Sequence, residues 1–237
     1  MISEITNIYR NAFINLIAQY RVIFRALLIP TLCLLLFRFE VLPHVEGKYF
    51  VRIASFVYLC FYAFLFLLLF RILINGPTVL NRCLESVISK STVYFILYVV
   101  CFLIVFHLLS LFVFSLISYP VSWVVFSLIK VCLIARIILV FPAISVNEYF
   151  SFTSSWRRTK RHQSLMIIIS LTVVLLREFS KSLSDQLFAF TNGNNYVVSF
   201  FEVMIWGLIV ALIVEVFKLI QMKNNASKIN SQKTVVI

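Results

Sequence analysis

The sequence predicts an all-α protein: a polytopic bundle of about six transmembrane helices, preceded by an amphipathic helix at the membrane interface. Three observations support this fold class. Hydrophobic residues make up 62% of the 237 residues and charged residues 13%, whereas soluble domains carry about 25% charged residues. The mean hydropathy is +1.02. Only four glycines and five prolines are present, so a loop-rich or disordered chain is not expected.

The first 20 residues have the pattern of an amphipathic helix, because apolar side chains recur at spacings of three and four and polar ones fill the opposite face. Two positions for this helix are equally compatible with the pattern: the cytoplasmic headgroup layer, or the bundle's own loops. The segment lacks the uninterrupted apolar core of a cleavable signal peptide, so the mature chain is expected to begin near Met1.

Six apolar segments are candidates for membrane spans, since about 20 residues of helix cross the hydrocarbon layer. Residues 53–70 contain no charged side chain, and the uncharged stretch from 91 to 129 is too long for one crossing, so we divide it at the turn residues 118–122. The segments 26–37 and 165–176 are shorter and could each be a tilted or re-entrant helix. The predicted spans are about 22–41, 53–74, 93–117, 122–145, 165–188 and 197–220. They form one domain over 1–222, followed by a polar cytoplasmic tail over 223–237.

The distribution of positive charge predicts that both termini are cytoplasmic. With six spans, fourteen of the 21 lysines and arginines fall in inner segments and five in outer segments, while Lys130 and Arg136 lie inside the fourth span. Cytoplasmic loops near spans are enriched in these residues. Losing one span from the count would move the tail to the outer side.

Four ionisable residues are expected within apolar spans: Lys130, Arg136, Glu202 and Glu215. If the fourth span reaches the surface near Ser145, Arg136 lies roughly 14 Å deep and must face protein or water. We therefore hypothesise that Arg136 pairs with Glu215 and Lys130 with Glu202, which would make the fourth and sixth spans neighbours. Ionisable residues in a membrane are functional candidates by default, although purely structural pairs occur as well.

A basic, tryptophan-containing segment follows the fourth span. Pro142 is expected to kink or end that span, because its ring blocks the bond to residue 138. Ser151 can cap a short helix that runs through the next residues. The candidate lipid- or partner-binding residues of this segment are Trp156, Arg157, Arg158, Lys160 and Arg161. They suit anionic headgroups, and they equally suit an ordinary positive inner loop with an interfacial tryptophan.

The same region carries a recognisable motif: Ala135-Arg136, Phe141-Pro142-Ala143, Ser151, Ser154-Ser155 and Trp156-Arg157-Arg158-Thr159-Lys160. It resembles the membrane domain found in some glycerophosphodiester phosphodiesterases and in stand-alone bacterial integral membrane proteins, mainly over residues 135–185. The chain departs from that pattern at Arg161-His162, where the family usually has Gly-Asn. The resemblance implies a bacterial inner membrane. It implies no activity, since the stand-alone members have none that is settled.

Catalytic and metal chemistry have little support in the sequence. One aspartate, Asp185, and three histidines are too few for a phosphodiesterase centre. The ATPase, zinc-protease and serine-hydrolase motifs are absent. The five cysteines include no CxxC pair and are expected to act as small hydrophobes. We therefore expect no enzyme activity, metal or cofactor. The net charge of +12 is spread between apolar runs, which disfavours nucleic acid as a partner.

Two function classes remain. The first is a structural or accessory membrane protein that binds membrane lipids, including anionic ones, or another membrane protein through the basic tryptophan segment. The alternative is a small transporter or channel subunit with a buried polar line of Lys130, Arg136, Glu202 and Glu215.

Overall fold

The computed structural model describes residues 2–37, 47–76, 89–146, 152–190 and 195–234, and these residues form helices without a strand. The helices, in chain order, are α1 (Ile2–Ala18), α2 (Tyr20–Leu36), α3 (Lys48–Asn75), α5 (Lys90–Leu116), α6 (Val121–Ile137), α7 (Val140–Ser145), α8 (Phe152–Lys160), α9 (Gln163–Phe190) and α10 (Asn195–Thr234). The all-helical class predicted from composition is therefore confirmed. The predicted polar tail differs in part, because α10 continues as a helix beyond residue 223.

In the part of the chain that the structure describes, five helices are long and apolar enough to cross a membrane: Ile53–Asn75, Lys90–Leu116, Val121–Ser145, Gln163–Phe188 and Phe201–Asn224. They correspond to the second to sixth predicted spans. The first predicted span, 22–41, is not among them, since α2 has 17 residues with Pro30 inside it and a helix of that length rises only about 25 Å. The uncertain segment 165–176, in contrast, lies within the continuous helix α9.

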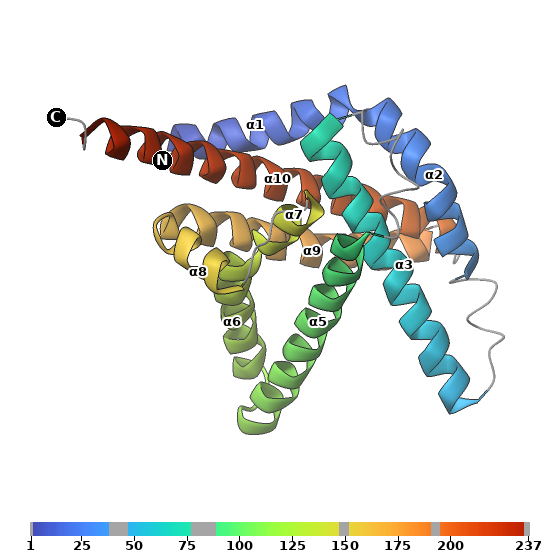
Figure 1. Ribbon diagram of the computed structural model, residues 1–237. Coiled ribbons are helices and arrows are strands. Elements are labelled where there is room, and N and C mark those ends of the chain that lie inside the picture. Colours follow the sequence, from blue (N-terminus) through green and yellow to red (C-terminus); the bar gives the residue numbers. More distant parts are fainter. Residues whose placement is uncertain (1, 38–46, 77–88, 147–151, 191–194, 235–237) are drawn as a thin grey trace.

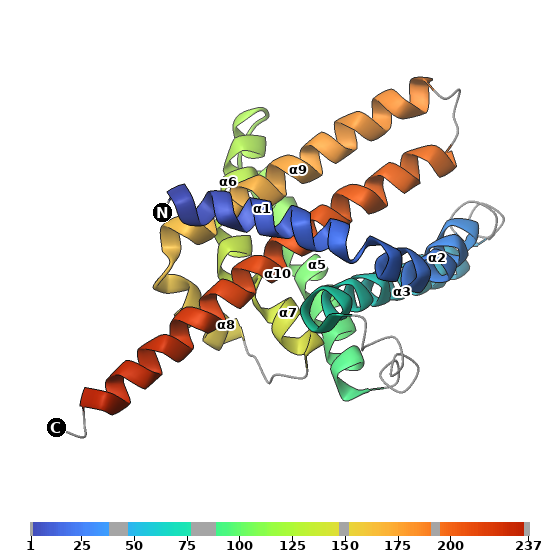
Figure 2. The same cartoon turned by 90° about the horizontal axis from the view of Figure 1, so that it is seen from above.

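The long helices fan out from a common region. Figure 1 shows α5 and α6 joined at one end by their turn and separating toward the other end, with α3 leaning away from both. The views in Figures 1 and 2 agree that α9 and α10 run side by side and that α1 lies along α10. Short connections between antiparallel helices explain the α5–α6 and α9–α10 hairpins.

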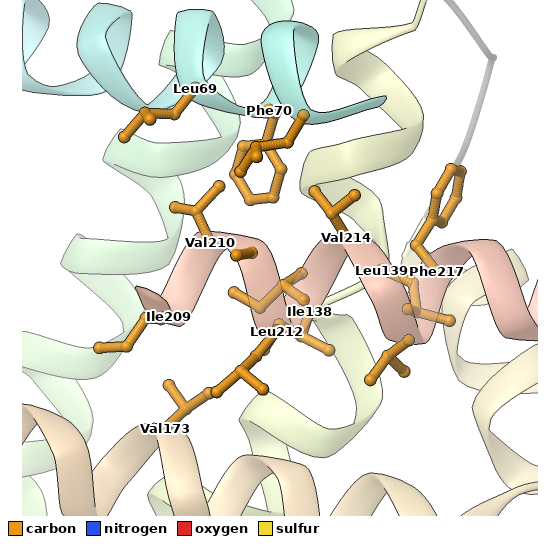
Figure 3. Close-up of a cluster of buried hydrophobic side chains, with 14 of the residues drawn as sticks. Leu69, Phe70, Ile138, Leu139, Val173, Ile209, Val210, Leu212, Val214 and Phe217 are labelled. Atoms are coloured by element: carbon orange, nitrogen blue, oxygen red, sulfur yellow. The ribbon is translucent and has the colours of Figure 1, made fainter. Parts of the chain in front are cut away.

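The core occupies the place where these helices meet. It is built from apolar residues of 65–73 in α3, 138–144 around α7, 165–173 in α9 and 209–220 in α10. In Figure 3, Leu69 and Phe70 approach α10 from one side and Val173 from the other. More than half of the apolar stretch of α10 is buried, 56%, against 6% for α5. The bare apolar surface of α5 is what a helix facing lipid presents.

The helix α1 packs on α10 and contacts α9. Its Glu4 carboxylate accepts a bond from Lys223 at 2.7 Å, and Asn15 donates to Glu215 at 2.6 Å. Tyr9 and Thr172 share a hydroxyl–hydroxyl bond of 2.5 Å. The Lys223 ammonium holds the pKa of the Glu4 carboxyl below its usual value. One apolar side of α1, including Phe13, remains exposed, so packing on the bundle leaves a face for headgroups as well.

Arg71 of α3 connects three helices at the edge of the core. The residue is only 4% exposed, and its Nε donates to the carbonyl of Ser145 at 3.0 Å. Its Nη2 donates to Ser91 at 2.8 Å and to Ser89 at 3.3 Å. The end of α3 is thereby tied to the end of α7 and the start of α5. Arg71 falls within the second predicted span, 53–74, and no structural role for it was predicted from the sequence.

Replacing Arg71 with methionine should lower the free energy of unfolding by about 2 to 4 kcal/mol, because a buried carbonyl and two hydroxyls lose a charged donor. Thermal unfolding of the detergent-solubilised protein measures the effect. Arg25→Met on the exposed side of α2 is the control and should change stability by no more than about 0.5 kcal/mol. Equal melting temperatures for the two variants would contradict a structural role for Arg71.

Candidate functional site

The site begins with an interruption of the fourth predicted span. Residues 138 and 139 form a turn between α6 and α7. Pro142 lies four residues after Ile138, and its ring has no N–H to donate to that carbonyl. The interruption therefore lies one turn before the proline, where the helical hydrogen bond would have been required.

The helix α8 is attached to this interruption by a side-chain bond. Ser155 is fully buried, and its hydroxyl donates to the carbonyl of Arg136 at 2.6 Å. That carbonyl belongs to the last turn of α6, whose carbonyls lack partners within their own helix. Thr159, also fully buried, donates to the carbonyl of Ser155 at 2.9 Å one turn earlier in α8. The predicted cap Ser151 lies outside the described residues.

This arrangement determines the surroundings of Arg136. α6 ends at Ile137 and the basic helix α8 packs beside that end, although the apolar span continues through α7 to Ser145. Arg136 therefore lies in the last turn of α6, where a cation interacts favourably with the helix dipole. Packing of α8 on α6 gives Arg136 a protein surface to face within the span.

Trp156 lies against the Arg136 guanidinium. The guanidinium carbon is 5.2 Å from the centre of the indole ring, a distance at which a cation and an aromatic face attract each other. The Arg136 Nη1 atom is buried and has no hydrogen-bond partner among the described residues. Trp156 itself is 50% exposed. The pair thus combines an unsatisfied buried donor with an aromatic ring that is open on one side.

The other cations of the segment lie on α8 and in the turn that follows it. Arg157, Lys160 and Arg161 are exposed, whereas Arg158 is partly buried and makes contacts of its own. Lys160 shares a side of the helix with Trp156, because residues four apart are neighbours on a helix. We call Trp156, Arg157, Lys160 and Arg161 the basic surface of α8.

The turn after α8 brings a histidine close to the N-terminal contact. Burial lowers the pKa of His162, and the nearby Lys223 lowers it further, while Glu4 acts in the opposite sense. Since α1, α10 and the α8–α9 turn meet here, the end of α10 and the site on α8 lie on the same side of the molecule.

The pairs hypothesised from sequence are wrong. Lys130 lies 3.9 Å from Glu178 of α9 and 4.5 Å from the ring centre of Phe126. Glu215 accepts from Asn15 and from Lys218 at 3.1 Å, and Glu202 accepts from Ser184 at 3.1 Å. The reason is that α6, which carries both cations, packs chiefly against α9, while the part of the fourth span that packs on α10 is α7.

A small pocket opens beside the arginine–tryptophan pair. Its volume is about 240 Å³, and it is lined by four residues of α6 including Cys132 and Arg136, by Trp156, and by three residues of α9 including Met166 and Ile167. Most of this lining is apolar. Among the described residues no group of three or more His, Cys, Asp or Glu side chains is arranged to hold a metal ion.

Removing the Ser155 hydroxyl should release α8 from α6. Ser155→Ala leaves a buried carbonyl without its donor, which costs about 1 to 2 kcal/mol, so amide hydrogens of α8 should exchange about tenfold faster. Hydrogen exchange read by mass spectrometry measures this. Ser164→Ala, an exposed serine of α9, is the matched control. Unchanged exchange in α8 of the Ser155 variant would show that this bond does not hold the helix.

Comparisons with known proteins find nothing similar to this chain: no family model matches it, and neither does a curated protein or a solved structure. The family resemblance of residues 135–185 therefore rests on the sequence motif. The physical roles of that motif come from its contacts, in which Ser155 and Thr159 fix α8 and Trp156 lies against Arg136.

Proposed function

We propose that this chain is an integral membrane protein with an accessory role, which binds anionic lipid headgroups at the cytoplasmic face through the basic surface of α8. The observation that carries this proposal is the attachment of a cationic helix to the end of a membrane-spanning one. Buried Ser155 and Thr159 fix one side of α8, and the exposed cations occupy the other.

The chemistry of the basic surface fits an anionic membrane surface. Each lysine or arginine near such a surface contributes about 1 kcal/mol to binding. Trp156 is half exposed beside these cations, and indole rings favour the level of the headgroups. Because α8 is docked and not free to reorient, the cations need little further ordering when they bind. The resemblance of this segment to stand-alone bacterial membrane proteins favours the bacterial inner membrane as the location.

The alternative of a transporter or channel subunit finds no support in the site. Its four candidate residues are Lys130, Arg136, Glu202 and Glu215, and no contact joins any two of them among the described residues. Lys130 and Glu202 each contact a residue of α9, Glu215 contacts α1 and its own helix, and Arg136 contacts α8. A partner protein at the basic surface remains the other form of the accessory role, and the lipid experiment below distinguishes the two.

We also infer six crossings with both termini on the cytoplasmic side. Five crossings would put the ends of the chain on opposite sides, yet the Glu4–Lys223 ion pair joins α1 to the inner part of α10. Lys218 likewise donates to the carbonyl of Leu73 near the end of α3. The start of α3 lies about 40 Å from that end, so we infer one further crossing between α1 and the start of α3.

Single cysteines in a cysteine-free background test this topology. With an impermeant maleimide on intact cells, Phe50→Cys and Tyr119→Cys should react, because both positions are exposed at outer helix ends. Ser3→Cys should react only after the membrane is opened. Reaction of positions 3 and 50 from the same side would contradict a crossing by α2.

Neutralising the basic surface should abolish the lipid preference. Extraction into polymer nanodiscs, followed by mass spectrometry of copurified lipids, is expected to show anionic lipid enriched around the native protein. The variant with Arg157, Lys160 and Arg161 all changed to glutamine should lose that enrichment by about tenfold or more, given about 1 kcal/mol per charge.

A variant of equal charge loss provides the control. Arg10, Arg21 and Arg25 are exposed on α1 and α2, and their replacement by glutamine should leave the enrichment in place. Equal loss in both triple variants would mean that net charge, and not α8, attracts the lipid. Loss of a copurifying protein in place of a lipid would identify a protein partner and overturn the lipid proposal.

A further inference from the structure

We propose that the pocket between α6, α8 and α9 holds one anionic phospholipid, with its phosphate group on Arg136 and part of an acyl chain against the apolar wall. This inference rests on the proposed function and names the ligand of the same region. It differs from general attraction to the basic surface because it requires one lipid in one position.

The pocket has the size for part of a lipid. Its volume of about 240 Å³ is below the range of roughly 300–1,000 Å³ in which complete small-molecule ligands are enclosed. The lining from Leu133, Met166 and Ile167 is apolar, and Ile167 is 39% exposed. A chain segment can therefore enter from the outside of the helices while the rest of the molecule stays in the bilayer.

Arg136 supplies the polar end of the pocket. Its guanidinium remains charged in any protein and its only interaction with the described residues is the contact with Trp156. A buried guanidinium N–H without an acceptor costs free energy, as at Nη1 here. A phosphate matches the guanidinium in charge and can accept two of its hydrogens at once. A phospholipid supplies that phosphate next to hydrocarbon.

Trp156 is placed to control access to the arginine. The Nη1 atom is covered in this conformation, and the indole ring beside the guanidinium is half exposed. Binding of a phosphate at Nη1 therefore requires a side chain that covers this atom to move aside. Lys160, one turn along the same side of α8, can then meet the remaining negative charge of the headgroup.

Native mass spectrometry of the full chain tests the site. The protein is exchanged into detergent with added phosphatidylglycerol, and parallel samples receive phosphatidylcholine, oleate or inorganic phosphate. The native protein should retain one phosphatidylglycerol at detergent levels that strip bulk lipid. Arg136→Gln should reduce the retained fraction about tenfold, as should Ile167→Trp, which fills the pocket without removing the charge.

Two controls keep the result specific. Leu171→Trp adds the same ring one turn further along α9 at an exposed position outside the pocket lining, and Arg177→Gln removes an exposed cation of α9; both should retain the lipid. Melting curves for all variants identify any that fail to fold.

The outcomes separate this proposal from the proposed function. Retention in Arg136→Gln and Ile167→Trp, with loss only in the triple variant of α8, would overturn the pocket and leave surface binding standing. No retained lipid and no anionic enrichment in any sample would overturn both. Preferential retention of oleate, or of inorganic phosphate, would overturn the assignment of a phospholipid.

Discussion

The site depends on the hydrogen bond from the Ser155 hydroxyl to the carbonyl of Arg136. Pro142 interrupts the membrane-spanning helix and the turn at 138–139 separates α6 from α7, so the last carbonyls of α6 require donors from elsewhere. The Ser155 hydroxyl is one such donor, and its bond holds α8 against α6. The cations of α8 are consequently held at the level of Arg136, and Trp156 lies against its guanidinium.

The helices are packed closely together in only one part of the molecule. Its core joins α3, α7, α9 and α10 on one side of the bundle, where Arg71 and the contacts of α1 also lie. The other ends of the helices diverge, and α5 is almost bare. In water such exposed apolar surface would drive association, whereas in a bilayer the lipid covers it. The contacts that hold the helices together therefore lie on one side, and α5 leaves its apolar surface uncovered on the other.

Much of the fold could be predicted from composition and periodicity. The five long spans, the hairpin turn near Pro120 and the helical N-terminus all follow from apolar runs and their breaks. The ion pairs could not, because the partner of Lys130 depends on which helices are neighbours. The burial of Arg71 likewise arises from the packing of three separate elements. Pro142 indicated that the helix is interrupted, but only the fold shows that the Ser155 hydroxyl donates to the carbonyl of Arg136 at that point.

The docking of α8 is tested most directly by measuring the distance between α8 and α9 in a membrane. Spin labels at Thr153 and Leu171, both exposed, report it by pulsed electron spin resonance on protein in lipid nanodiscs. A docked α8 predicts one narrow distance distribution, which should broaden when the Ser155 hydroxyl is removed. A broad distribution in the native protein would mean that α8 is not held on α6, and the basic surface would then have no fixed relation to Arg136.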